Sequence, residues 1–199
     1  MTAETHVTTD PAHAFKDARD ALDAFISDAD NARRLTDVAK LIADAFRNGN
    51  KVLACGNGGS CADAMHFCEE LTGRFRHDRP PLPAIACIDP GHITCTANDY
   101  GYDAVFARWV EALGKPGDIL VAISTSGNSQ NIINAVDVAK AQGLHTVGLL
   151  GKTGGALKGR CNHQWIAPGA TADRIQEIHM LVLHTLIEHI ELNLAGSKK

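Results

Sequence analysis

Apolar residues recur at helical spacing in two stretches near the start of the chain. In the first, which follows Asp10-Pro11, they are Phe15, Ala18, Leu22, Phe25 and Ile26. In the second they are Leu35, Val38, Ile42, Ala45 and Phe46, before Asn48-Gly49-Asn50 ends the pattern. This period predicts amphipathic helices, so residues 1–50 are expected to be a helical N-terminal extension. Because these helices precede the first strand, we expect them to lie outside the alternating core and to pack on a partner subunit.

Beyond Lys51, short apolar runs alternate with stretches of helical pattern. The runs that predict strands are 52–55, 84–88, 119–124, 146–150 and 164–167. The stretches that predict helices are 61–75, 106–113, 130–142, 155–159 and 173–194. Such alternation is typical of a parallel sheet with helices on both faces. The expected fold is therefore α/β, a three-layer αβα arrangement with a five-stranded parallel sheet plus the N-terminal helices.

The last predicted helix is apolar on more than one face. Its apolar residues include Ile175, Ile178, Val182, Leu186, Ile187 and Ile190. A helix that is apolar all round is normally buried. Burial in a subunit interface would suit it, so we expect an oligomer.

Length and composition narrow the class of protein. The 199 residues, 45% of them hydrophobic, suffice for one well-buried core, so a single domain over residues 1–199 is expected. The net charge of -4 comes from mixed acids and bases without a basic stripe, so no nucleic-acid partner is expected. No apolar run approaches the roughly 20 residues of a membrane span, and the polar start lacks a secretory pattern. We expect no membrane association and a cytoplasmic location.

Six cysteines occur, and none forms a C-x-x-C pair. They are Cys55, Cys61, Cys68, Cys87, Cys95 and Cys161. Most are expected to be reduced packing residues. Cys61 is the exception, because it follows a glycine-rich loop and could face a ligand.

Two predicted strands are followed by similar loops. Gly56-Asn57-Gly58-Gly59-Ser60 follows the first strand, and Ser124-Thr125-Ser126-Gly127-Asn128-Ser129 follows the third. Loop amides and helix N-termini at the carboxyl ends of parallel strands bind anions, and the hydroxyls add donors. The alternative is that these residues only form turns and cap helices. The two loops together favour a phosphate site, although neither is a nucleotide-binding fingerprint.

Acid and base candidates lie on two predicted helices. His66 and Glu70 are four residues apart and therefore share one helix face, where they could hold a metal or a substrate or form an ordinary solvated contact. The final helix carries Asp173, Gln176, Glu177, His179, His184, Glu188 and His189. These polar groups need partners, in a subunit interface or in an active site. Gln176 and His184 are about 12 Å apart along a regular helix axis and about 80° apart around it, so one ion could touch both only if each side chain reached inward.

Several motifs together resemble one family. They are C-G-N-G-G-S at 55–60, D-A-M-H-F-C-E-E-L-T-G-R at 63–74, A-N-D-Y-G at 97–101, I-S-T-S-G-N-S at 123–129 and D-R-I-Q-E-I-H at 173–179. On these residues the chain is identified as a member of the sugar isomerase (SIS) domain family, whose fold is flavodoxin-like. It most resembles the phosphoheptose isomerases within that family.

The resemblance implies an aldose-ketose isomerase, an intramolecular oxidoreductase. Such an enzyme converts D-sedoheptulose 7-phosphate to D-glycero-D-manno-heptose 7-phosphate, the first step toward ADP-heptose for the lipopolysaccharide core. It also implies a homotetramer with sites at subunit interfaces. By motif position, Glu70 matches the catalytic base and His184 the catalytic acid. Positions matching substrate contacts are Asn57, Gly58, Gly59, Glu70, Asn98, Asp99, Ser124, Thr125, Ser126, Ser129 and Gln176. A zinc ion, one per subunit, is implied at His66, Glu70, Gln176 and His184.

The implied chemistry needs a base and an acid. Moving a carbonyl between C2 and C1 requires a proton to leave one carbon and another to reach its neighbour through an enediol, which suits a carboxylate and an imidazole. Zinc could polarise the carbonyl. Glu70 bound to zinc is a poorer base, so its two roles alternate or the metal is structural. Cys61 occupies a variable position near the first loop.

Three alternatives remain open at this level. One is a non-catalytic SIS protein that binds the bacterial replication initiator, which shares the loops but lacks the glutamate and histidine at positions 70 and 184. Another is a phosphosugar-sensing regulator, which needs the loops but no acid and base. The third is an isomerase acting on a different ketose phosphate.

Overall fold

The computed structural model describes residues 10–196 and begins with two helices. α1 spans Pro11–Ile26 and α2 spans Ala29–Arg47. The side chain of Asp10 accepts a hydrogen bond from the Ala12 amide at 2.9 Å, and that of Asp28 accepts one from the Asp30 amide at 3.0 Å. Each aspartate thus satisfies an amide that the first turn leaves without a partner, which explains where the two helices begin.

Five parallel strands form one sheet in the order β2-β1-β3-β4-β5. They are β1 (Val52–Gly56), β2 (Ala84–Ala86), β3 (Ile119–Ser124), β4 (His145–Gly151) and β5 (His163–Ala167). The predicted five-stranded parallel sheet is confirmed, although β2 ends at Ala86 rather than at residue 88. β1 and β3 are neighbours, with Gly56 opposite Ile123. The two glycine- and serine-rich loops therefore leave the same edge of the sheet side by side.

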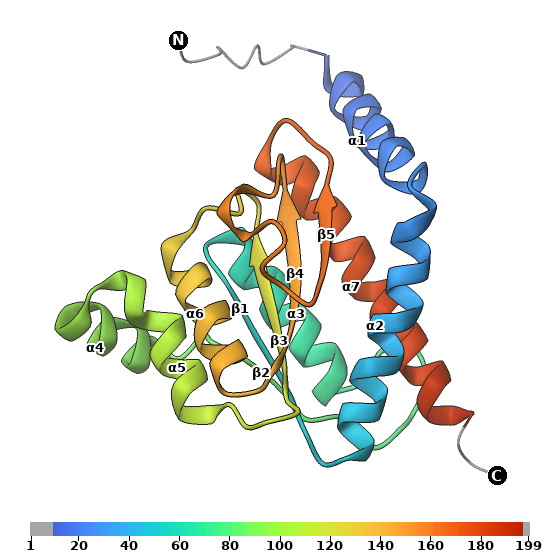
Figure 1. Ribbon diagram of the computed structural model, residues 1–199. Coiled ribbons are helices and arrows are strands. Elements are labelled where there is room, and N and C mark those ends of the chain that lie inside the picture. Colours follow the sequence, from blue (N-terminus) through green and yellow to red (C-terminus); the bar gives the residue numbers. More distant parts are fainter. Residues whose placement is uncertain (1–9, 197–199) are drawn as a thin grey trace.

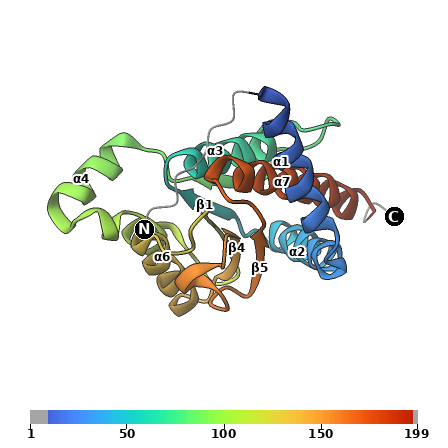
Figure 2. The ribbon, with the colours of Figure 1, turned by 90° about the horizontal axis from the view of Figure 1, so that it is seen from above.

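Helices cover both faces of the sheet (Figures 1 and 2). α3 (Gly59–Thr72) and α7 (Ala172–Ala195) lie on one face, and α5 (Val105–Leu113) and α6 (Gln130–Ala141) lie on the other. Along β3, Val121 packs in the cluster beneath α3 and α7, whereas Leu120 packs in the cluster beneath α5 and α6. Both are fully buried, as expected for a parallel strand covered on both faces. The predicted three-layer αβα arrangement is confirmed.

α2 belongs to the core, so the expectation that both N-terminal helices lie outside it is wrong. Val38 and Ile42 of α2 are fully buried in the same cluster as Leu186 and Ile187 of α7. The reason is that α7 is apolar beyond the face that it turns to the sheet, and α2 covers this second face. α1 is less buried, and its Phe15 side chain is 77% exposed.

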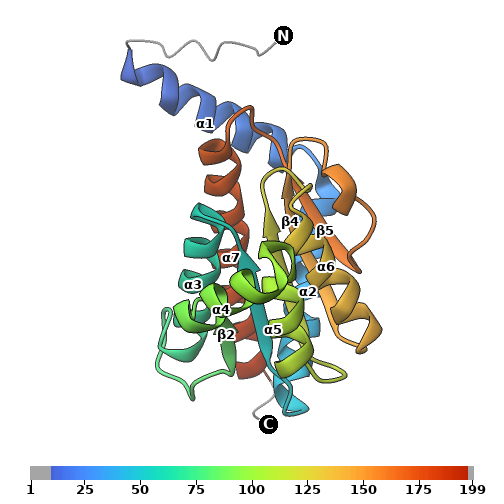
Figure 3. The same ribbon diagram turned by 90° about the vertical axis from the view of Figure 1, so that its left-hand side faces the viewer.

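One helix was not predicted, and one predicted helix is only a short turn. α4 spans Pro90–Tyr100 and projects from the body of the molecule (Figures 1 and 2), so that it lies in front of the body in Figure 3. Only one of its residues is buried, so its sequence carries no apolar stripe. A 3-10 turn, η1 (Tyr102–Ala104), follows it. Residues 155–159 form only a short turn of this kind, η2 (Gly155–Leu157), because Gly154 and Gly159 on either side of it have positive φ angles that a right-handed helix does not allow.

All six cysteines are free thiols, in agreement with the prediction of reduced residues. Cys55, Cys68 and Cys87 are buried, whereas Cys95 is exposed on α4. Among the described residues, no helix is both long and apolar enough to cross a membrane.

Asp118 joins the starts of β1 and β3. Its carboxylate accepts hydrogen bonds from the amides of Lys51 and Lys115 at 3.0 and 2.9 Å, from Asn50 Nδ2 at 3.2 Å, and from the ammonium group of Lys51. The residue is 1% exposed. Burial by itself raises the pKa of Asp118, but the hydrogen bonds from Lys51, Asn50 and Lys115 outweigh it and hold the pKa below its ordinary value.

We expect Asp118→Asn to lower the free energy of unfolding at pH 7 by about 3 kcal/mol, because it leaves the partly buried ammonium group of Lys51 without its counter-ion and removes a buried acceptor of several hydrogen bonds. A group with a lowered pKa in the folded state stabilises the fold above its unfolded pKa, and the effect disappears as the pH falls through the folded pKa. The difference in the free energy of unfolding between wild type and variant, measured by urea unfolding, should therefore shrink below about pH 4. Asp137→Asn, which removes an exposed pair with Arg160, is the control and should cost less than about 0.5 kcal/mol. A difference that is the same at pH 7 and at low pH would contradict this account.

Candidate active site

The first loop makes a tight turn that only glycine permits at two positions. A Cβ atom at Gly56 would lie 2.5 Å from the carbonyl oxygen of Ser60, and Gly58 has a φ angle of 56°. Side chains are therefore excluded at the end of β1 and at the N-cap of α3. The backbone at the start of α3 is left accessible to a ligand, because Gly58 and Gly59 are both exposed.

Asn57 ties this loop to α6 and to η1. Its Nδ2 donates to Asn131 Oδ1 at 3.0 Å, and Asn131 Nδ2 donates back to Asn57 Oδ1 at 3.0 Å. The Tyr102 hydroxyl donates to the same Asn57 oxygen at 2.9 Å. Asn131 is 2% exposed, so this pair is fixed in the interior. The sequence interpretation singled out Asn57 but missed Asn131 and Tyr102, whose proximity depends on how α6 and η1 pack.

The second loop closes on itself through its hydroxyl groups. Ser124 Oγ lies 3.3 Å from Ser129 Oγ and accepts from the Gly127 amide at 3.1 Å. Gly127 has a φ angle of 65°, and a Cβ there would overlap the carbonyl of Gly154. Ser129 precedes α6 without capping it through its side chain. The first amides of α6 therefore remain available to an anion, with the positive end of the helix dipole behind them.

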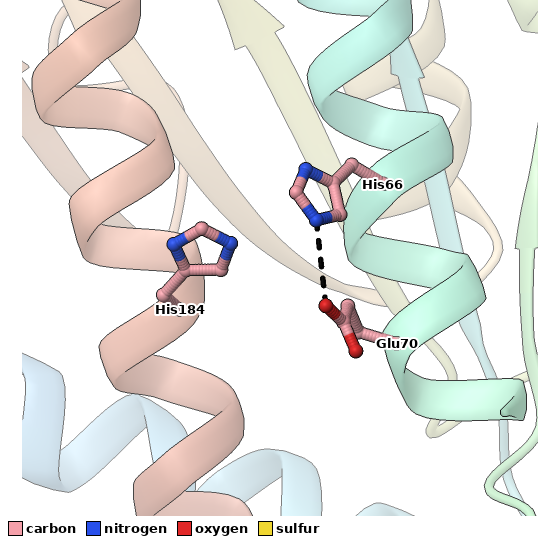
Figure 4. A group of neighbouring side chains, drawn as sticks. All are labelled: His66, Glu70 and His184. Atoms are coloured by element: carbon pink, nitrogen blue, oxygen red, sulfur yellow. Dashed lines mark ion pairs between the residues drawn. The ribbon is translucent and has the colours of Figure 1, made fainter. Parts of the chain in front are cut away.

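A cluster of His66, Glu70 and His184 lies between α3 and α7 (Figure 4). One nitrogen of each histidine and one oxygen of Glu70 all lie within 4.8 Å of one another. His66 Nε2 is 3.4 Å from Glu70 Oε1, and the two imidazole rings meet edge to face with their centroids 5.0 Å apart. Helical spacing alone predicted the His66–Glu70 contact. Only the packing of the two helices adds His184, and it does so within a single chain.

His184 is held in a partly buried setting. The ring of Phe75 stacks on it with centroids 5.8 Å apart and planes 21° apart. Burial lowers the pKa of His184, and the positive charges of His66 and Arg76 lower it further, against an opposing effect of Glu70. The imidazole is therefore neutral at pH 7, a form that can bind a metal or exchange a proton.

Gln176, the fourth predicted metal ligand, lies toward the first loop. It precedes His184 by two turns of α7, about 12 Å along the axis. A Cβ at Gly59 would lie 2.9 Å from Gln176 Oε1, so this glycine lets α7 approach the first turn of α3. The side chain therefore lies beside the predicted phosphate loops.

Asn98 and Asp99 lie near the end of the projecting helix α4, and both are exposed. Asn98 Nδ2 donates to Asp99 Oδ1 at 2.8 Å, and the Cys95 thiol contacts Asp99 Oδ2 at 3.5 Å. Both contacts are within α4. That Asn98 and Asp99 also contact a substrate stays a prediction. Cys61 is half-buried behind the first loop, and burial raises the pKa of its thiol.

Asp63 was not singled out from the sequence. It lies on α3 one turn before His66, and its Oδ2 is buried with no hydrogen-bond partner. Burial raises the pKa of Asp63 to about 6, against the lowering effect of the His66 charge. Its place in the D-A-M-H segment was visible in the sequence, but its burial depends on the fold.

Comparisons with known proteins cover most of the chain. A model of the SIS domain family matches residues 15–151. The phosphoheptose isomerase of Fusobacterium nucleatum is 56% identical over 178 residues, which are 89% of this chain and 92% of that protein. The phosphoheptose isomerase of Vibrio cholerae is 52% identical over 180 residues, 90% of this chain and 94% of that protein. A solved structure of a phosphoheptose isomerase from Francisella tularensis superposes with a TM-score of 0.86 at 37% identity, covering 91% of this chain and 96% of that one.

Proposed function

The chain belongs to the SIS domain family and within it to the phosphoheptose isomerases, and from this membership we propose its function. It is an isomerase that converts D-sedoheptulose 7-phosphate to D-glycero-D-manno-heptose 7-phosphate. The single observation that carries this function is that one chain places Glu70 and His184 in one cluster. A non-catalytic phosphosugar-binding protein needs neither residue, so that alternative is not favoured.

The proposed reaction assigns one proton transfer to each residue. The Glu70 carboxylate takes a proton from C1 of the ketose, and the electron pair left behind forms the C1–C2 double bond of an enediol. The oxygen on C2 gains a proton from the protonated imidazole of His184, which becomes neutral. Glu70 then returns a proton to C2 while His184 removes one from the C1 hydroxyl, so C1 becomes the aldehyde. A positioned acid and base of this kind typically contribute about 10²- to 10⁴-fold each to the rate.

The two loops would hold the other end of the substrate. The hydroxyls of Ser124, Thr125, Ser126 and Ser129 and the free amides at the start of α6 would bind the phosphate. Asn57, Gly58, Gly59 and Gln176 would contact the sugar, together with Asn98 and Asp99.

The cluster also suits a zinc ion. Two imidazoles and a carboxylate are the nitrogen and oxygen donors that zinc takes in catalytic sites, with bonds of about 2.0–2.1 Å. The donor atoms of His66, Glu70 and His184 are close enough for small side-chain rotations to bring them around one ion. A bound zinc ion would polarise the substrate carbonyl. Gln176 is part of this proposed set only if its side chain reaches from two turns away.

We expect protein purified without chelator to contain about one zinc ion per chain, because a site with three such ligands retains zinc. Metal analysis by mass spectrometry would measure it. His66→Ala should lose most of the metal, whereas His77→Ala, which changes an exposed histidine outside the cluster, should retain it. Wild-type protein that holds no metal and is fully active would remove zinc from the proposal.

An assembly is also part of the proposal. We propose a homotetramer of single-domain chains, each domain spanning residues 1–199, with residues 1–50 as its helical extension. Large apolar side chains exposed on α3, near β2 and on α7 support an assembly, since soluble proteins rarely leave such groups uncovered. They are Met65, Ile85, Ile88 and Leu181. The free cysteines are in keeping with a cytoplasmic location, which we also propose. The proposed reaction would be the first step of ADP-heptose synthesis for the lipopolysaccharide core.

The function is tested by incubating the protein with D-sedoheptulose 7-phosphate and zinc and following the aldose product. Turnover to the heptose 7-phosphate is expected. D-fructose 6-phosphate serves as the comparison ketose, and preferential turnover of this shorter substrate would assign the chain to another sugar. No turnover of any ketose phosphate would overturn the enzymatic function.

A further inference from the structure

Arg79 lies in the segment between α3 and β2, and its side chain turns back under the end of α3. The side chain is only 12% exposed. Its Nη2 donates to the carbonyl oxygen of Glu70 at 2.7 Å, and its Nη1 donates to that of Leu71 at 2.8 Å. The last carbonyls of a helix have no partner within the helix. Arg79 therefore fixes the final turn of α3, and one of the groups that it holds is the backbone of Glu70 itself.

The same guanidinium group also holds α7. Its Nε donates to Glu191 Oε1 at 2.7 Å, and the Glu191 side chain is 11% exposed. Glu191 follows His184 by seven residues, which places both on nearly the same face of α7 about 10.5 Å apart. One buried group thus connects the helix turn that carries Glu70 to the helix face that carries His184.

We propose that Arg79 and Glu191 are positioning residues that set the separation of Glu70 and His184. Neither belongs to the His66–Glu70–His184 cluster or to the two loops. Their effect on the reaction passes through the two helices. This inference rests on the proposed function, because it assigns the acid and base roles to the residues being positioned.

A second ion pair joins the same segment to α7 and shows why burial matters. Arg76 Nη1 lies 2.7 Å from Glu188 Oε1, but these side chains are 54% and 39% exposed. Water can replace either partner there. Loss of Arg79 instead removes the donor of the Glu70 carbonyl and of the Glu191 carboxylate in a largely buried place and leaves the Leu71 carbonyl with only the Leu82 amide, so the last turn of α3 must move. A shift of about 1 Å at reacting groups can lower a rate by about 100-fold.

The expected effect is on the chemical step rather than on binding. The predicted phosphate loops lie at the opposite end of α3, about 16 Å from Glu70 along the helix axis. Displacement of the last turn leaves the loops in place. We therefore expect kcat to fall while KM stays nearly constant.

The experiment measures kcat and KM for sedoheptulose 7-phosphate in wild type and Arg79→Ala. We expect kcat to fall by about 100-fold, with KM changed by less than about 3-fold. Added guanidinium ion should restore much of the lost kcat, because Arg79 and Glu191 line an open cavity of about 480 Å³ that the ion can enter. Arg33→Gln, which breaks an exposed pair with Asp30 on α2, is the control and should keep wild-type kinetics at every guanidinium concentration.

Two milder variants keep the test valid if Arg79→Ala does not fold. Arg79→Lys keeps the charge but not the forked donors, and Glu191→Gln keeps the shape and one acceptor. Both should fold and assemble as wild type, and both should show a lower kcat at constant KM. A folded variant with wild-type kcat, a KM that rises in step with the loss, or a folded Arg79→Ala variant that does not respond to guanidinium would overturn the inference. Wild-type protein without turnover would instead overturn the proposed function on which the inference rests.

Discussion

Glu70→Gln is expected to lower kcat for sedoheptulose 7-phosphate by about 10³-fold or more, while the folded protein and its assembly persist. Glutamine has nearly the same shape as glutamate, but it cannot take a proton from C1. Steady-state kinetics with the purified variant would measure the loss. KM should change little, because the phosphate loops are far from this residue.

Glu69→Gln is the matched control for this experiment. Glu69 precedes Glu70 on α3, its side chain is 66% exposed, and its carboxylate lies 3.9 Å from His66 Nε2. Loss of this charge should leave kcat within about 3-fold of wild type, since exposed pairs contribute little. Wild-type turnover by Glu70→Gln would show that another group is the base. Equal losses in both variants would point to a general effect of negative charge near His66 rather than to one base.

His184→Gln is the second change with a large expected effect, a fall in kcat of about 10²- to 10⁴-fold. The amide can donate and accept hydrogen bonds beside Phe75, but it cannot exchange a proton with the two substrate oxygens. Because burial and the nearby positive charges lower the pKa of His184, its protonated form gives up a proton readily, as the transfer to the C2 oxygen requires. Turnover and oligomeric state would be measured on the same sample.

His189→Gln provides the comparison on the same helix. His189 is half-buried five residues further along α7 and is not part of the cluster with Glu70. Its replacement should leave kcat close to the wild-type value. If His184→Gln were as active as His189→Gln, the proton transfers between oxygens would have to be assigned to another group, and Asp63, with its pKa of about 6 and unpartnered oxygen, would be the next to test.

Much of the fold could be predicted from local pattern. Strands such as β3 are continuous apolar runs bounded by turn residues, and the structure places β3 at the residues expected, Ile119–Ser124. α4 could not be found in this way, because it projects from the body and buries almost nothing. The position of α2 was also missed. An apolar stripe along a helix shows that one face is buried, but it does not show which element covers that face.

The sequence by itself determined the order of the strands and of the helices that pack on the sheet, the two loops at one sheet edge, and the pairing of His66 with Glu70. All of these follow from short-range periodicity, because helix spacing and strand direction are properties of the local backbone. Only the tertiary structure decided that His184 joins that pair within the same chain and that Arg79 connects the two helices. Residues 70 and 184 are more than one hundred positions apart, so their proximity depends on how α3 and α7 pack together on the sheet. That packing results from the burial of apolar surface between several elements, and the sequence of one segment does not specify which other segment will cover it.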